Sequence, residues 1–158
     1  MSPEEKIEEK IEKLVKKYPN GDAALLPLLH LLQEEEGHGK MITRESMERA
    51  AKLLNVPVSR VKGVVSFYTM YNQKPVGKYF IQICTNIACS ILNAQEIVDH
   101  IEKKLGIKVG ETTPDGKFTL ATVECLGSCG TAPMMQINND YYENLDTSRV
   151  EEILAGLK

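Results

Sequence analysis

The sequence predicts an α/β (α+β) chain in which a helical part precedes a part that mixes strands and helices. Over residues 1–74, apolar side chains recur at helical spacing, and only short breaks separate the apolar stripes. From residue 75 the period changes, and β-branched and aromatic runs alternate with helical ones. With 42% hydrophobic and 26% charged residues, the composition is ordinary for a folded domain.

The charge and the apolar pattern argue against several classes of protein. The 158 residues carry a net charge of −3, with a pI of about 5.7, which weighs against a nucleic-acid binder and a basic membrane-surface patch. The longest apolar stretch, residues 23–32, is far shorter than the ~20 residues that span a bilayer. The first residues lack the pattern of a signal peptide. We therefore expect a cytoplasmic chain without membrane insertion and without a nucleic-acid partner.

The helical part is expected to form a compact bundle over residues 1–74. Ser2 and Thr43 are the predicted caps of the first and third helices. The fourth helix is expected to turn Tyr68 inward, and the isolated histidines His30, His38 and His100 are interpreted as structural. The four helices are predicted at about residues 3–17, 22–36, 43–54 and 58–68.

The second part is predicted in the order strand, helix, strand, strand, strand, helix. A strand, a crossover helix and a second strand form a right-handed parallel unit in nearly all known cases. The carboxyl ends of the first two strands should therefore share one edge of the sheet, where α/β folds usually place their sites. The strands are expected near residues 78–84, 118–124, 134–137 and 141–145, and the helices over 93–105 and from 146 onward.

This order of strands and helices predicts that all four cysteines lie close together at that edge of the sheet. Cys84 ends the first strand and Cys125 ends the second, while Cys89 and Cys129 lie in the two loops that follow. Parallel pairing would bring the thiols together, whereas antiparallel pairing would separate the two pairs. Nearby, the hydroxyls of Thr85, Ser90 and Ser128 and the N–H groups of Gly127 and Gly130 are candidate hydrogen-bond donors to sulfur.

The cysteine spacing favours an iron–sulfur cluster. It is C-x4-C, then 35 residues between Cys89 and Cys125, then C-x3-C. Zinc sites usually contain C-x2-C, and so do thioredoxin-type dithiols. Plant-type ferredoxins share the C-x4-C gap, and a two-iron cluster suits ligands that come in two pairs. One zinc on all four cysteines and unligated thiols remain the alternatives.

Several motifs of the sequence stand out: GVVSFYT at 63–69, Cys84 and Cys89, VECLGSC at 123–129 and APM at 132–134. Together they resemble the 24 kDa [2Fe–2S] subunits of NADH:quinone oxidoreductase, respiratory complex I, a family of thioredoxin-like ferredoxins. The resemblance covers nearly the whole chain. It implies a thioredoxin-like domain with a mixed four-stranded sheet over residues 75–158. It also implies that Cys84, Cys89, Cys125 and Cys129 ligate one [2Fe–2S] cluster, called N1a in complex I.

The resemblance implies an electron-transfer subunit of an NADH dehydrogenase, in the peripheral arm of a membrane-bound complex. NADH and FMN would bind only to a partner flavoprotein subunit, with whose flavin the cluster would exchange single electrons. In agreement, the sequence has no G-x-G-x-x-G after a strand, no G-x-x-x-x-G-K-[ST] and no catalytic residues that we can name. The alternatives are a free-standing thioredoxin-like ferredoxin and the diaphorase subunit of an NAD-linked hydrogenase or formate dehydrogenase.

Overall fold

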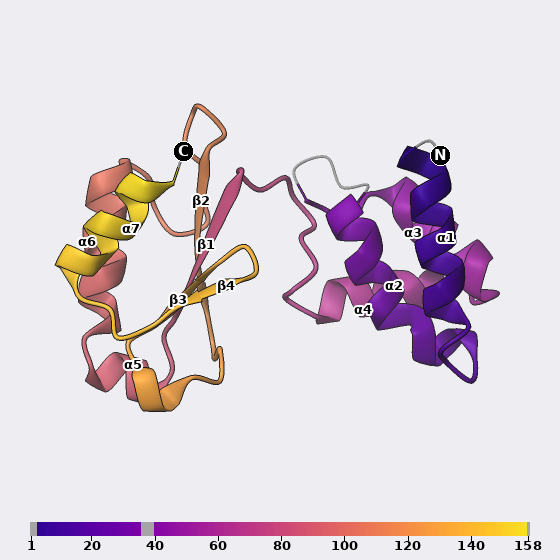
Figure 1. Cartoon of the computed structure of the whole chain (residues 1–158), viewed down its shortest axis with the longest axis horizontal. Helices are drawn as coiled ribbons and strands as arrows, with labels where there is room; N and C mark the ends of the chain where they lie inside the picture. The colour runs from indigo at the N-terminus through magenta and orange to yellow at the C-terminus, as the bar shows by residue number, and fades with distance from the viewer. Residues whose placement is uncertain (1–2, 36–39, 158) are drawn as a thin grey trace. The chain divides into compact units, whose positions relative to one another are not determined.

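The computed structural model describes residues 3–35 and 40–157. The chain divides into two compact units, Met1–Pro75 and Val76–Lys158, each with its own helices or strands (Figure 1). The predicted cap Ser2 and the histidine His38 lie outside the described residues. None of the helices in the described ranges is both long enough and apolar enough to cross a membrane.

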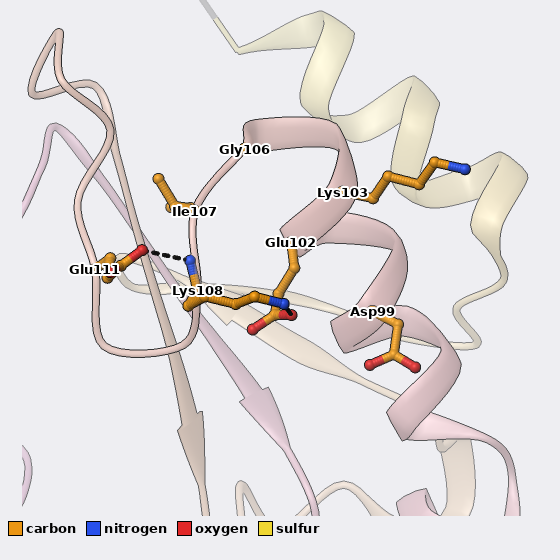
Figure 2. A pocket seen from close by; sticks show the side chains of 7 residues that line it. All are labelled: Asp99, Glu102, Lys103, Gly106, Ile107, Lys108 and Glu111. Atoms are coloured by element: carbon orange, nitrogen blue, oxygen red, sulfur yellow. Dashed lines mark hydrogen bonds and ion pairs between the residues drawn. The ribbon is translucent and has the colours of Figure 1, made fainter.

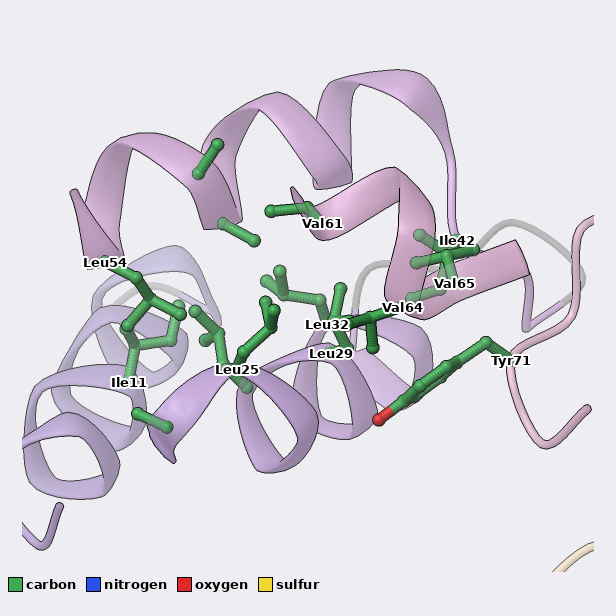
Figure 3. Close-up of a cluster of buried hydrophobic side chains, with 14 residues drawn as sticks. Ile11, Leu25, Leu29, Leu32, Ile42, Leu54, Val61, Val64, Val65 and Tyr71 are labelled. Carbon is green, nitrogen blue, oxygen red and sulfur yellow. The ribbon is translucent and has the colours of Figure 1, made fainter. Parts of the chain in front are cut away.

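The first unit contains the predicted helices around one core. They are α1 (Pro3–Val15), α2 (Gly21–Glu35), α3 (Arg44–Leu54) and α4 (Val58–Phe67). Thr43 caps α3 as predicted, because its side chain accepts a hydrogen bond from the Ser46 N–H at 3.1 Å. Figure 3 shows how the apolar side chains of the four helices meet, among them Ile11, Leu25, Leu29, Leu32, Leu54, Val61 and Val65.

The end of α4 differs from the prediction. The helix ends at Phe67, so Tyr68 lies at the C-cap and is 38% exposed instead of buried. Tyr71 joins the core in its place: it is 2% exposed, and its hydroxyl donates to the Leu26 carbonyl at 2.9 Å. The chain turns after α4, since the Tyr71 N–H donates to the Tyr68 carbonyl at 3.1 Å. A helical period cannot show which residue returns to the core after such a turn.

The second unit is built on a mixed four-stranded sheet, as predicted. Its strands are β1 (Tyr79–Cys84), β2 (Phe118–Val123), β3 (Met135–Ile137) and β4 (Asp140–Tyr142). They lie in the order β2-β1-β3-β4. β1 and β2 are parallel, while β3 is antiparallel to both of its neighbours. β4 ends at Tyr142 rather than at the expected position 145.

The described residues of this unit also form three α-helices: α5 (Ile87–Ile91) and α6 (Ala94–Leu105) lie between β1 and β2, and α7 (Thr147–Gly156) follows β4. A short 3-10 helix, Cys129–Thr131, lies between β2 and β3. α6 and α7 pack side by side on one face of the sheet (Figure 1). α5 occupies a segment where the sequence predicted a loop, because five residues are too few to show a helical period. The core between sheet and helices includes Ile81, Ile83, Ile97, Ile101, Leu120, Val150 and Leu154.

The loop over residues 110–113 closes the outer edge of β2. The Gly110 N–H donates to the Leu120 carbonyl at 2.7 Å, and the Leu120 N–H donates to the Glu111 carbonyl at 3.1 Å. The Thr113 N–H donates to the Phe118 carbonyl at 2.8 Å. The first half of β2 therefore has hydrogen-bond partners on both sides.

Candidate metal centre

The register of the parallel strands brings the two cysteine segments to one edge of the sheet. Cys84 pairs with Val123, and Cys125 comes two residues later. The Thr85 N–H donates to the Val123 carbonyl at 3.0 Å, so the segment leaving β1 stays bonded to the end of β2. The predicted parallel pairing is thus confirmed, and both segments leave the sheet at the same edge.

The first cysteine pair is buried. Cys84 and Cys89 are 3% and 2% exposed and pack with Ala94 and Met134. Cys89 belongs to α5 rather than to a loop. α5 begins directly after the strand, where the Asn86 side chain accepts a hydrogen bond from the next N–H. The short distance along the chain from strand to helix places both thiols in one apolar surrounding.

The second cysteine pair is exposed. Cys125 and Cys129 lie on the segment that joins β2 to β3, a segment that ends in a cis peptide between Ala132 and Pro133. The Gly127 N–H donates to the Cys125 sulfur at 3.3 Å. Gly127 has a φ of +79°, a left-handed conformation that glycine adopts without strain. This N–H bond to sulfur agrees with the prediction made for Gly127.

The three candidate hydroxyls have oxygen partners rather than sulfur partners. Thr85 donates to the Val123 carbonyl at 3.3 Å, and Ser90 donates to the Thr85 carbonyl at 2.8 Å. Ser128 donates to the carboxylate of Glu143. Carbonyl and carboxylate oxygens are better acceptors than sulfur, so each hydroxyl turns toward the nearest one. These side chains fix the loops around the thiols.

The thiols of both pairs interact with one another. The Cys84 thiol lies within hydrogen-bond reach of Cys89 and Cys125, and Cys89 is close enough to Cys129 to be affected by its charge. Burial raises the pKa of Cys84, but backbone N–H groups and the neighbouring thiols outweigh burial and leave this pKa below its usual value. Burial and Cys84 raise the pKa of Cys89. A second negative charge beside the first is therefore unfavourable without a cation.

The donor set fits a binuclear cluster. All four cysteines are free, and Cys84 and Cys89 interact with each other and with the thiols of the second pair. Over the described residues, no three His, Cys, Asp or Glu side chains gather closely enough to hold a single metal ion. Thiolates are soft ligands that suit iron–sulfur clusters and zinc, and a [2Fe–2S] cluster takes four of them. Iron held by these residues would also offset the negative charge that burial disfavours.

The described histidines have structural partners, as predicted. The His100 Nε2 lies 2.8 Å from a Glu151 carboxylate oxygen, and the His30 ring packs on Tyr71 with centroids 5.1 Å apart. Both contacts join neighbouring elements within one unit. They give these side chains a role in packing.

A charged pocket lies at the opposite end of α6 from the cysteines (Figure 2). The Lys108 ammonium lies 2.6 Å from a Glu102 carboxylate oxygen, and the Lys108 N–H donates to Glu111 at 2.7 Å. The Val109 N–H donates to Glu102 at 3.0 Å. These interactions fasten the loop after α6 to the helix and pair the charge of Lys108 with that of Glu102. The lining residues of the pocket are Asp99, Glu102, Lys103, Gly106, Ile107, Lys108 and Glu111.

Sequence reasoning missed Glu143. This residue follows β4, and its carboxylate accepts hydrogen bonds from Ser128 and Thr131 in the loop of Cys125 and Cys129. A single acidic residue after a strand gives no signal in the sequence. Only the path of the chain after β4 shows that Glu143 belongs to the surroundings of the site.

Comparison with known sequences agrees with this geometry. The family model for thioredoxin-like [2Fe–2S] ferredoxins matches residues 11–158. The chain is 46% identical over 145 residues to an NADH-quinone oxidoreductase subunit of Rickettsia typhi, covering 90% of this chain and 84% of that protein. It is 43% identical over 151 residues to an NADH-quinone oxidoreductase subunit of Thermus thermophilus, covering 94% and 82%. It is 39% identical over 152 residues to an NADH-quinone oxidoreductase subunit of Rhizobium meliloti, covering 96% and 89%.

A solved structure shares the fold. The air-oxidized NAD+-reducing [NiFe]-hydrogenase contains a similar region, with a TM-score of 0.72 and 20% sequence identity. The likeness covers 84% of this chain and 22% of the hydrogenase chain. At this identity it speaks for the fold alone. The family match and the relatives, each covered over most of its length, show that the chain belongs to the thioredoxin-like [2Fe–2S] ferredoxin family.

Proposed function

We propose that this chain is the electron-transfer subunit of an NADH-quinone oxidoreductase. Its cluster ligands are Cys84, Cys89, Cys125 and Cys129. The observation that carries the proposal is the meeting of two thiol pairs at one sheet edge, in a member of a [2Fe–2S] family. The parent complex is supported by relatives named as NADH-quinone oxidoreductase subunits, which match this chain over 82% to 89% of their own length.

The candidate cluster site has a buried side and an exposed side, which are formed by different residues. A bound [2Fe–2S] cluster supplies one-electron transfer. Cys84 and Cys89, packed with Met134, exclude water from one side of the site. Cys125 and Cys129 place the other side at the surface, where a partner can approach. The Gly127 N–H donates to the Cys125 sulfur and would there stabilise negative charge on a cluster held by this thiolate.

The finer assignments belong to the same proposal. The cluster is of the N1a type and exchanges electrons with the flavin of a partner subunit that binds NADH and FMN. The chain lies in the peripheral arm, on the cytoplasmic side. Residues 75–158 carry the cluster, and residues 1–74 form a bundle that docks on the partner. Support for docking comes from Phe67 at the end of α4, which is 77% exposed and contacts Tyr68 edge-on.

Anaerobic purification of the tagged chain from its own cells tests the proposal. We expect about two irons and two acid-labile sulfides per chain, an EPR signal after dithionite reduction, and a flavin-containing partner. A folded chain with zinc and no sulfide would contradict the cluster. A loaded chain recovered without a flavoprotein would contradict the partner and favour a free-standing ferredoxin.

Single substitutions test the ligands. Replacing Cys84, Cys89, Cys125 or Cys129 by Ala should abolish or strongly reduce bound iron and sulfide, because each change removes one thiolate. Ser59→Ala, at an exposed position of α4, should keep the full content. The two exposed cysteines are the sharper probes, since their replacement leaves no buried cavity, and circular dichroism checks the fold. Normal cluster content in all four variants would rule out the assignment.

A further inference from the structure

The loop of Cys125 and Cys129 has a partial hydrophobic anchor in Leu126, which is half-buried and packs against the buried cluster that contains Cys84 and Cys89. None of the residues 124–130 is buried. Segments with few buried contacts open at the lowest free-energy cost. A cluster needs its ligands at a fixed spacing, however, so hydrogen bonds are needed in addition to this partly buried contact to hold the loop.

A single carboxylate oxygen, Oε1 of Glu143, accepts hydrogen bonds from two hydroxyl groups of the loop. The hydroxyls of Ser128 and Thr131 both donate to Oε1 of Glu143, the latter at 2.6 Å. The two hydroxyls also lie 2.8 Å apart, so the three side chains form a closed set. Ser128 and Thr131 hold the pKa of the Glu143 carboxyl below its usual value. The carboxylate is therefore ionised at neutral pH, and hydrogen bonds to a charged acceptor are the stronger ones.

The residues on either side of Glu143 also form hydrogen bonds with the loop of Cys125 and Cys129. The Tyr141 hydroxyl donates to the Leu126 carbonyl at 2.8 Å, and the Asn144 N–H donates to the Thr131 carbonyl at 2.8 Å. Because β4 is paired with β3, this segment is anchored in the sheet. Glu143 thus connects this loop, which contains a short 3-10 helix at Cys129–Thr131 but no buried side chain between residues 124 and 130, to the sheet.

We propose that Glu143 is a positioning residue of the cluster site, which fixes the loop of Cys125 and Cys129 by accepting hydrogen bonds from Ser128 and Thr131. The inference rests on the proposed ligands and extends them to a residue outside the cysteine motifs. The buried pair, Cys84 and Cys89, is set by β1 and α5 and does not depend on this carboxylate.

Two substitutions separate the hydrogen bonds from the rest of the side chain. Glu143→Gln keeps an oxygen that can accept both hydroxyls, whereas Glu143→Ala removes it. Glu152→Ala, at an exposed position of α7, is the matched control. In the full-length metal-free chain, Glu143→Ala should speed amide hydrogen exchange at Thr131 and Asn144 by about tenfold or more. Glu143→Gln should restore most of the protection, and exchange in β1 should stay unchanged.

The reconstituted chain supplies the second readout. Glu143→Ala should bind less iron and sulfide and show an altered EPR line shape, because one ligand pair is no longer held in place. Glu143→Gln should recover the cluster content and the line shape of the unsubstituted protein. Recovery by Gln distinguishes positioning from a general loss of stability.

The outcomes separate this inference from the proposed function. Exchange in Glu143→Ala equal to that in Glu152→Ala overturns the positioning role. Faster exchange with unchanged cluster content and EPR line shape also overturns it. An unsubstituted chain that takes up zinc but no iron or sulfide overturns the proposed function instead, while hydrogen exchange still decides whether Glu143 holds the loop.

Discussion

Single side chains give the two halves of the candidate site different characters. Cys84 and Cys89 are held by burial, so their positions follow from the packing of the second unit. Cys125 and Cys129 are exposed, and hydrogen bonds fix their loop. Substitutions in the hydrophobic core should therefore disturb the positions of Cys84 and Cys89. Substitutions of hydrogen-bonding side chains should disturb the positions of Cys125 and Cys129.

Tyr71 should make the stability of the first unit depend on alkaline pH. Burial, with a contribution from Tyr68, raises the pKa of Tyr71 from 10.0 to about 12. As the pH rises, the Tyr71 hydroxyl therefore ionises in the unfolded chain before it does so in the folded chain. Below pH 10, the neutral Tyr71 makes its full contribution to the free energy of unfolding. This contribution should fall as the pH rises from 10 towards 12, by at most about 3 kcal/mol.

Tyr71→Phe tests this prediction by urea denaturation between pH 8 and pH 11.5. The variant should be less stable at pH 8 by about 1 kcal/mol, because the hydrogen bond to the Leu26 carbonyl is lost. Its stability should decline less steeply at high pH than that of the unsubstituted protein. Tyr18→Phe, at an exposed position, should follow the unsubstituted protein. Parallel pH profiles for all three proteins would contradict the shifted pKa.

Two glycines of the first unit differ in how much space surrounds them. Gly21 begins α2, and a Cβ there would lie 2.2 Å from the Leu54 carbonyl oxygen at the end of α3. Gly63 lies within α4, and a Cβ there would meet nothing within 4 Å. Gly21→Ala should lower the free energy of unfolding by about 1–3 kcal/mol. Gly63→Ala should raise it by roughly 0.5–1 kcal/mol. Chemical denaturation measures both, and equal effects would contradict the tight contact at Gly21.

Elements long enough to show a period were predictable from the sequence. The helix expected at 93–105 is found as α6, Ala94–Leu105, and the strand–helix–strand order correctly predicted a parallel pair. The five residues of α5 were missed because they span less than two helical turns. The inward position of Tyr71 was missed because it depends on a turn after α4 rather than on a period.

The candidate site was predictable to the same extent. The cysteines follow strand ends, and strand ends can be located from the sequence, so their common edge could be inferred. The partners of Ser128 and Thr131 could not, because Glu143 comes from a later segment that reaches the loop only in the folded chain. The spacing of the cysteines in the sequence also could not show which of the two pairs is buried.

At the scale of the whole molecule, each unit has its own hydrophobic core. The buried cluster of the first unit contains residues from 11 to 71. The two buried clusters of the second unit contain residues from 81 to 154. The free energy that stabilises each unit therefore comes chiefly from its own residues.

Leu28→Ala tests the independence of the two units. Leu28 has an exposed fraction of 0% in the first core, so the substitution should cost about 2–5 kcal/mol. Amide hydrogen exchange should become faster across α2 and α3 and stay unchanged in β1 and β2. Leu53→Ala, at a position 40% exposed, should change stability by less than about 0.5 kcal/mol. Loss of protection in β1 of the Leu28 variant would show that the units unfold together.

The loop that closes the outer edge of β2 also bears on self-association. An edge strand with free backbone groups can pair with a strand of another molecule and so begin an aggregate. Residues 110–113 already occupy the outward-facing groups of β2 between Phe118 and Leu120. At the other edge, β4 is only three residues long and begins with the charged Asp140. The first half of β2 and the short β4 are thus poor templates for a further strand, which lowers the tendency of the second unit to pair with other molecules.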